Sequence, residues 1–309
     1  MSYYYPEGAL WEMPENRASF ATLAAMEQAK AAGKILESRA LVCDAHHDLI
    51  VDMGAWRGVI PREEGAIGIA NGTTRDIAMI SRVNKPVCYK IISLERQGER
   101  IVPYLSRRAA QEECMEQYIK MLRPGDVIPA RVTRLDSFGC FVDIGCGLPS
   151  LIPIDAISVS RISHPRDRFL PGQSIRAIVR STEDGGRVCL SHKELLGTWE
   201  ENAAHFSPGE TVSGIVRSVE NYGVFVELAP NLAGLAEPKE GVRAGQHASV
   251  YIKSLIPERM KIKLILVDAF DGEARQPEFT YFFTGSHMDY WRYSPENSHR
   301  VVETVFGKP

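Results

Sequence analysis

The sequence predicts a mainly β protein built from small barrels in tandem, and three observations support this. Residues 131–152 and 215–236 align at a constant offset of 84, which matches Phe138 to Tyr222 and reveals an internal repeat. Many apolar residues lie in short, alternating, β-branched runs bounded by Gly or Pro, which is the pattern of half-buried strands. The 309 residues suffice for about two to three domains of ordinary size, so each core is expected to be small.

The N-terminal elements begin with one amphipathic helix predicted over residues 15–37, an Ala-rich segment with apolar residues at helical spacing. A weaker copy of the repeat follows, in which residues 49–54 align with residues 140–145. In this copy His47 and Ile50 occupy the positions that aromatic rings hold in the other copies. We therefore expect the first copy to be a docking or spacer module.

The middle copy contains five strand patterns, which predict a small closed barrel. Gly139 is expected to let the second strand begin with a bulge or a positive φ, so that Phe138 and Phe141 share one face. The predicted strands cover residues 126–135, 140–144, 148–152, 174–182 and 187–191.

Two linker helices are predicted, over 106–122 and 193–206. The aromatic-rich tail is expected to fold back and cap a barrel or the N-terminal helix, with extra RNA stacking as the alternative. The predicted domains, in chain order, are an N-terminal helical segment (1–36), a degenerate barrel (37–108), a helical linker (109–122), the main barrel (123–193), a second linker (194–207), a shortened barrel (208–270) and a C-terminal extension (271–309).

Pairs of aromatic residues mark a candidate RNA site in two copies. Phe138 and Phe141 in the middle copy, and Tyr222 and Phe225 in the last, place two rings close together on a twisted sheet, where unpaired bases can stack. The alternative is that these rings fill the barrel cores. Inward positions such as Val142 already supply apolar side chains, which favours exposed rings.

A loop of the middle copy adds basic residues that the last copy lacks. It is expected to bring Arg161, Arg166 and Arg168 to one rim, with His164 among them. An ordinary solvated loop is the alternative. The net charge is −3, yet residues 120–194 hold 11 Lys and Arg against 8 Asp and Glu, while residues 206–270 hold 7 of each. This modest basicity predicts weak, salt-sensitive phosphate binding by each module.

The middle copy resembles the RNA-binding repeat named after bacterial small-subunit ribosomal protein S1. The resemblance covers about residues 35–270 and rests on several marks in order: GDV (125–127), DSFGCFV (136–142), LPGQ (170–173) and GRVCLS (186–191). It implies tandem five-stranded OB-fold barrels joined by helical linkers, with the N-terminal helix ahead of them.

The resemblance also implies the residues that contact RNA. Phe138, Phe141 and Arg187 match positions that commonly do so in the family, and Tyr222, Phe225 and Lys261 are their counterparts in the last copy. Two positions depart from the family pattern, because its histidine after the third strand is replaced by Pro153 and by Glu237.

These features predict a protein that binds single-stranded RNA, including messenger RNA, and acts in translation. The small ribosomal subunit is a candidate partner. The alternative is an adaptor whose degenerate barrels dock on the ribosome or an RNA-processing complex with little RNA contact.

Other function classes find little support in the sequence. No phosphate-binding Gly loop, nucleophile elbow or metal-spaced ligand set occurs, so we expect no enzyme, no small-molecule substrate, no cofactor and no metal. The six cysteines show no CxxC pair, which predicts reduced thiols, and His46-His47-Asp48 lacks a third ligand at useful spacing. Without a signal peptide or a long apolar segment, the expected location is the cytoplasm, away from membranes.

Overall fold

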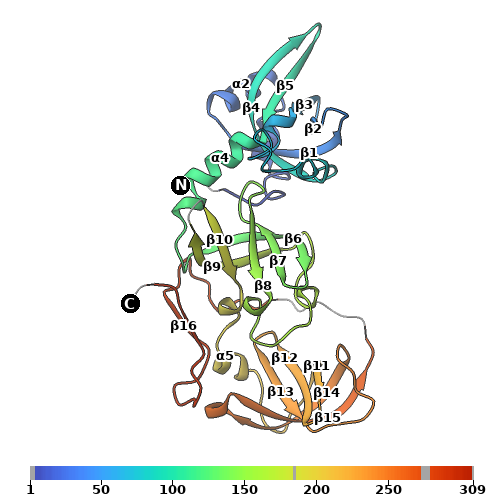
Figure 1. Cartoon of the computed structure of the whole chain (residues 1–309), viewed down its shortest axis with the longest axis vertical. Coiled ribbons are helices and arrows are strands. Elements are labelled where there is room, and N and C mark those ends of the chain that lie inside the picture. Colours follow the sequence, from blue (N-terminus) through green and yellow to red (C-terminus); the bar gives the residue numbers. More distant parts are fainter. Residues whose placement is uncertain (1–3, 184–185, 273–278, 308–309) are drawn as a thin grey trace. The chain divides into compact units, whose positions relative to one another are not determined.

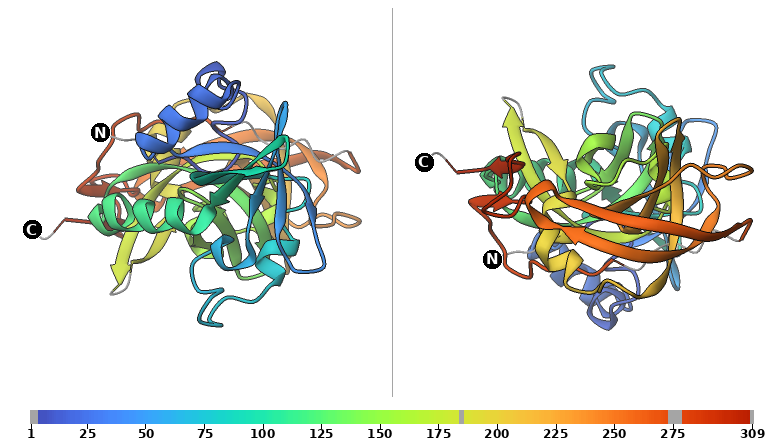
Figure 2. Two further views of the ribbon diagram at one scale, coloured as in Figure 1. Left: turned by 90° about the horizontal axis from the view of Figure 1, so that it is seen from above. Right: turned by 90° about the horizontal axis from the view of Figure 1, so that it is seen from below.

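The computed structural model describes residues 4–183, 186–272 and 279–307 and contains three closed five-stranded barrels (Figure 1). The predicted fold class, a mainly β protein of tandem barrels with helical connections, is confirmed. Figure 2 gives two further views of the same elements, with the strands of the last barrel in orange. The chain divides into two compact units: unit 1 holds residues 4–122, 129–131 and 143–149, and unit 2 holds the remainder. Each is described separately.

The first barrel, in unit 1, follows the strand order β1-β2-β3-β5-β4 and closes because β4 pairs back on β1. Alternating burial along the strands follows from the period of two, and it directs Leu36, Val51 and Leu105 into a dry core. The strands are β1 (Leu36–Cys43), β2 (Leu49–Met53), β3 (Trp56–Ile60), β4 (Pro86–Gln97) and β5 (Arg100–Ser106).

The predicted helix over 15–37 was wrong in its continuity. It consists of α1 (Pro14–Ala18) and α2 (Leu23–Ala31), and from Leu36 the chain is a strand. The break arises at Thr22, whose backbone is extended and whose hydroxyl accepts the Ala25 N–H at 3.2 Å, a cap that starts a new helix. Two shorter helices, η1 (Arg62–Glu64) and α3 (Ile77–Ile80), lie between β3 and β4.

A helix after the first barrel is confirmed. Ser106 ends β5 and its Oγ accepts the Ala109 N–H at 2.8 Å, which caps α4 (Arg107–Gln117). The short η2 (Ile119–Met121) follows.

The middle barrel confirms all five predicted strands to within one residue at each end. Its strand order is β10-β8-β7-β6-β9, with Val132, Val142 and Ile152 fully buried. The strands are β6 (Val127–Asp136), β7 (Gly139–Asp143), β8 (Pro149–Pro153), β9 (Ser174–Glu183) and β10 (Arg187–Ser191), and the helical turns are η3 (Ile154–Ala156) and η4 (Pro165–Asp167).

The second predicted linker helix, over 193–206, was wrong in its continuity. It is split into η5 (Lys193–Leu196) and α5 (Trp199–Ala203). Gly197 separates them with φ +84°, a left-handed conformation that glycine adopts without strain. Thr198 and Glu201 then form a reciprocal capping box that starts α5.

The last barrel, in unit 2, has the strand order β11-β12-β13-β15-β14. Its strands are β11 (Thr211–Glu220), β12 (Gly223–Ala229), β13 (Leu232–Ala236), β14 (His247–Ile256) and β15 (Lys261–Phe270), with η6 (Pro257–Arg259) between the last two.

The C-terminal extension folds back, as predicted. It forms a two-stranded sheet of β16 (Tyr290–Arg292) and β17 (Glu303–Val305). Trp291, Tyr293 and Phe306 are buried in one hydrophobic cluster with core residues of the last barrel, and the Tyr293 hydroxyl donates to the Asn231 carbonyl at 2.6 Å. The rings of the extension therefore stabilise unit 2.

Two features, a membrane-spanning helix and a cluster of metal ligands, were sought in the described residues. Within residues 4–183, 186–272 and 279–307, no helix combines the length and apolar character needed to span a bilayer. In the same residues no group of three or more His, Cys, Asp or Glu is arranged to hold a metal ion. All six cysteines are free thiols.

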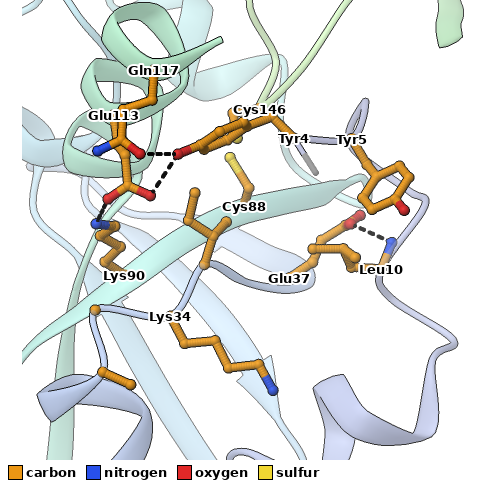
Figure 3. A pocket seen from close by; sticks show the side chains of 13 residues that line it. Tyr4, Tyr5, Leu10, Lys34, Glu37, Cys88, Lys90, Glu113, Gln117 and Cys146 are labelled. Carbon is orange, nitrogen blue, oxygen red and sulfur yellow. Dashed lines mark hydrogen bonds and ion pairs between the residues drawn. The ribbon is translucent and has the colours of Figure 1, made fainter. Parts of the chain in front are cut away.

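A buried carboxyl in unit 1 predicts pH-dependent stability. Glu37 lines a hollow of about 460 Å³ and accepts the backbone N–H groups of Gly8 and Leu10, the latter at 2.8 Å (Figure 3). Burial raises the pKa of Glu37 to about 7, from an ordinary value of 4.5.

Because the folded state holds the proton more tightly, this carboxyl contributes stability below pH 4.5 that is lost as the pH rises through about 7. We expect unit 1 to lose about 1–2 kcal/mol of unfolding free energy between pH 5.5 and pH 8 from Glu37 alone. Urea unfolding at both pH values should show this loss in the wild type and a smaller one in Glu37→Gln. The exposed control Glu12→Gln should lose as much unfolding free energy between the two pH values as the wild type does. An equal loss in the wild type and in both variants would refute the prediction.

Candidate nucleic-acid interface

The middle barrel presents its two phenylalanines together at one edge. Phe138 lies in the turn between β6 and β7 and is 54% exposed, and Phe141 is half-buried on β7. Their ring centroids are 5.9 Å apart and the ring planes are perpendicular. Such an arrangement offers one exposed ring face and one adjoining edge, which suits a flat base.

Gly139 makes this arrangement possible without the positive φ that was one of the two expectations. Its φ is not in the left-handed region. A Cβ there would lie 2.6 Å from the Ile152 carbonyl oxygen, and the Ile154 N–H donates to the Phe138 carbonyl at 3.0 Å. The glycine therefore permits close approach of the backbone after β8, which fixes the turn that carries Phe138.

Arg134 belongs to this site, although sequence reasoning missed it. Its guanidinium lies 4.3 Å from the centroid of Phe141 and forms an ion pair with Asp136 at 2.8 Å. The signal was available, because the repeat offset places Ser218 at this position in the last copy, and Ser218 pairs directly with Phe225. A cation thus stands beside the ring in the middle barrel only, of these two copies.

The last barrel repeats the ring pair. Tyr222 is 67% exposed, Phe225 is half-buried, and their centroids are 6.1 Å apart at 88°. Across the sheet Phe225 pairs with Leu235, which pairs with Lys263. Lys263 therefore lies in the same row as the ring and is a second basic residue that sequence reasoning missed. The middle barrel has Cys189 at that place.

Arg187 and Lys261 occupy equivalent places, each at the start of the fifth strand of its barrel. Both are exposed, with Arg187 opposite Glu183 and Lys261 opposite Ile256. Arg187 and Lys261 each lie two residues before the residue of the fifth strand that pairs with the third strand. Each barrel therefore has a cationic side chain near its ring pair.

The basic loop contributes two exposed arginines. Arg161 and Arg166 are open to solvent, whereas His164 is half-buried and caps η4, accepting the Arg166 N–H at 3.1 Å. The imidazole of His164 therefore stabilises the conformation of the loop that carries Arg166.

Arg168 was wrongly expected on the exposed rim. Its exposure is 0%, and its guanidinium forms an ion pair with Glu227 inside unit 2. Arg217 binds the same carboxylate at 2.8 Å. The sequence marks Arg168 as one more loop arginine, and only the packing of the loop on the last barrel reveals its acidic partner. A buried, paired arginine cannot contact RNA.

The first barrel lacks a ring at both expected places. His47 lies 3.6 Å from Asp76 instead of carrying an exposed ring face. The row that holds Phe225 in the last barrel is here Val42, Ile50, Val59 and Tyr104, in register across four strands. Three members of this row are aliphatic and offer no stacking surface, and Tyr104 on β5 is the aromatic one.

Comparison with known proteins identifies relatives of the middle barrel and of the chain. Residues 122–193 match the family model of the S1 RNA binding domain. The chain is 30% identical over 242 residues to the small ribosomal subunit protein bS1 of Staphylococcus aureus (strain COL), and the match covers 73% of this chain and 59% of that protein. A bS1 homolog of Bacillus cereus is 30% identical over 240 residues, covering 72% and 60%. The chain thus spans about three fifths of the length of these curated relatives.

A solved structure with a related description is a multidomain protein with nucleic acid binding domains from Streptococcus pneumoniae. It is 15% identical, covers 76% of this chain and 74% of its own, and has a TM-score of 0.25. We draw no structural argument from a likeness of that size.

Proposed function

Because the chain belongs to the family of proteins built from S1-type RNA-binding domains, we propose that it binds single-stranded RNA, with the middle barrel as the main site. The observation that carries this proposal is the exposed, perpendicular pair of Phe138 and Phe141 at the edge of that barrel. Stacking on such rings is tolerant of sequence, because every base has a flat face.

The geometry supports two kinds of RNA contact within the site, base stacking and phosphate binding. Phe138 and Phe141 stack bases, while Arg187, Arg161 and Arg166 meet backbone phosphates. The Arg134 guanidinium lies over the Phe141 ring. A base that stacks on this ring displaces the guanidinium, which is then free to contact a phosphate. Each stacked base contributes about 1–3 kcal/mol before the cost of ordering the strand, so we expect micromolar affinity that falls with salt.

The last barrel is proposed as a second, weaker site. Tyr222 and Phe225 retain the ring pair and Lys261 and Lys263 supply cations, but Glu237 adds a carboxylate beside β13 that repels phosphate. Two linked weak sites bind one strand more tightly than either alone.

The proposed biological role is binding of messenger RNA during translation, in the cytoplasm and with the small ribosomal subunit as partner. Support comes from the names of the relatives, which are small ribosomal subunit proteins. The alternative, an adaptor that docks on the ribosome with little RNA contact, is favoured by one observation: Ile50 stands in the first barrel at the place of the stacking rings Phe141 and Phe225. Co-sedimentation with ribosomes before and after RNase treatment distinguishes the RNA-binding role from the adaptor role, since an adaptor remains bound to the ribosome after RNase treatment.

The proposed RNA site is tested by titrating a fluorescent single-stranded RNA of about 12 to 20 nucleotides into the wild type and a Phe138→Ala/Phe141→Ala variant. Loss of both stacking surfaces should weaken binding about tenfold or more. Tyr290→Ala, which removes an exposed ring from the C-terminal extension, is the matched control and should bind as the wild type does. If the wild type fails to bind, or if the double variant binds equally well while folded, the proposal is wrong.

A further inference from the structure

An apolar face of the last barrel is open to solvent. Tyr251 on β14 pairs with Ile265 on β15, and both point outward. Ile265 is 48% exposed and Val267 is 52% exposed, and Phe270 is also exposed at the end of β15. We call these four residues the β14–β15 face. Exposed aliphatic side chains in a group mark interaction surfaces more often than isolated ones do.

The same face can be located in the other barrels by strand register. In each barrel one residue of strand five pairs in parallel with strand three: Tyr104, Cys189 and Lys263. Two residues further along strand five stand Ser106, Ser191 and Ile265. Their partners on strand four are Lys90, Ile178 and Tyr251.

In the first barrel a helix covers this position. Ser106 is buried and caps α4, which begins at the next residue and packs along β4. Glu113 of α4 forms an ion pair with Lys90, the strand-four member of the pair (Figure 3). A lysine on the sheet therefore meets a carboxylate on the covering helix.

In the middle barrel a helical segment again covers it. Ile178 and Ser191 are both fully buried. Ile178 shares one hydrophobic cluster with Leu195 of η5 and Trp199 of α5, and the Ser191 hydroxyl donates to the Glu194 carboxylate. The cover in both barrels is thus a helical segment that presents a glutamate to the sheet.

The last barrel has the open sheet without the cover. Ile265 replaces the serine that ends strand five in the other barrels, and β15 runs on to Phe270. Lys253, Lys261 and Lys263 are exposed on the same two strands, and none has an ion-pair partner among residues 4–183, 186–272 and 279–307. Apolar side chains flanked by unpaired lysines complement an apolar helix with acidic flanks.

We propose that the β14–β15 face docks an acidic amphipathic helix of a protein partner. The two covered barrels of this chain supply the geometry, and the unpaired lysines supply the charge preference. The face shares Lys261 and Lys263 with the proposed second RNA site, but its centre differs from that site, because Ile265 and Val267 are aliphatic and give bases nothing to stack on. A single-stranded RNA would instead favour the ring pair on β12 and the turn before it.

The test uses the full chain and a fluorescein-labelled helical peptide of about 18 residues, with leucines at i, i+3, i+4 and i+7 and glutamates beside them. Fluorescence anisotropy should show saturable micromolar binding. A scrambled peptide of the same composition should bind at least about tenfold more weakly. The Ile265→Glu/Val267→Glu variant should lose binding to a similar degree. Ile77→Glu, which changes an exposed isoleucine of unit 1, is the matched control and should leave peptide binding unchanged.

Three outcomes overturn the proposal. Equal binding of the amphipathic and scrambled peptides, or no binding, shows that the face does not select a helix. A loss of RNA affinity but not of peptide affinity in the double glutamate variant assigns the face to RNA. A dimer in light scattering that the same variant dissociates assigns it to a second copy of the chain. Circular dichroism confirms that each variant is folded.

Discussion

Replacing Glu227 by glutamine is expected to lower the stability of unit 2 by about 3–5 kcal/mol, one of the two largest effects predicted for this chain. Glu227 is buried and binds two arginines, Arg168 and Arg217, both with little or no solvent exposure. Glutamine keeps the shape but removes the charge, so the fully buried Arg168 loses its ion-pair partner and Arg217 keeps only Asp167, at 3.7 Å. Burial already lowers the pKa of Arg168, which shows how poorly this site tolerates an unpaired cation.

Hydrogen exchange of peptides from β11 to β15 measures this loss directly. Protection should fall by about two to three powers of ten, since each 1.4 kcal/mol is a factor of ten in the opening equilibrium. Glu220→Gln, an exposed residue of the same barrel, is the control and should leave protection unchanged. A Glu227→Gln variant with wild-type protection would mean that water reaches the two arginines and that the network contributes little.

Replacing Glu7 by glutamine is expected to have a comparable effect in unit 1, about 3 kcal/mol. Glu7 lies in the N-terminal segment and binds Arg107 at 2.7 Å and Arg82 at 3.0 Å, and it accepts the Cys88 N–H at 3.1 Å. Burial alone would raise the pKa of Glu7, but the Arg107 guanidinium holds this pKa below its ordinary value. The carboxylate is therefore ionised in the folded state, and its loss removes the ion-pair partner of Arg107.

The Glu7 variant should lose less stability than the Glu227 variant. Asp143 lies close to Glu7 and accepts its N–H at 2.7 Å, so its carboxyl group remains to compensate Arg107. Exchange of peptides from β4 and α4 reports on this loss, with the exposed Glu12→Gln as control. A greater loss for Glu7→Gln than for Glu227→Gln would contradict this account of the two networks.

Much of the fold and the central part of the candidate site could be predicted from the sequence. Strand positions in the middle barrel follow from alternation, which is a local property of period two, and the ring pairs follow from the repeat. The breaks at Thr22 and Gly197 could not be found in the same way, because apolar spacing continued across them. Those helix ends are set by capping side chains and by a glycine in the left-handed conformation. Both depend on a few atoms and not on the spacing of apolar residues.

Side-chain partners were the part that sequence reasoning missed. Arg168 and Arg161 look alike in the sequence, yet one is buried against Glu227 and the other is exposed. Lys263 joins the ring pair of the last barrel only because strand pairing brings residues distant in sequence into one row. Gly139 was correctly singled out, but it does not have the positive φ considered for it, and its close contact is with the backbone of a neighbouring strand.

The sequence by itself determined the repeat, the barrel strands and the rings of the proposed RNA site, because these follow from local periodicity and residue type. Only the tertiary structure decided which arginines remain free, how the N-terminal segment is anchored through Glu7, and which sheet faces are covered. The physical reason is that burial and ion pairing depend on contacts between residues far apart in the chain. The same strand positions are covered by helical segments in two barrels and open at Tyr251 and Ile265 in the third.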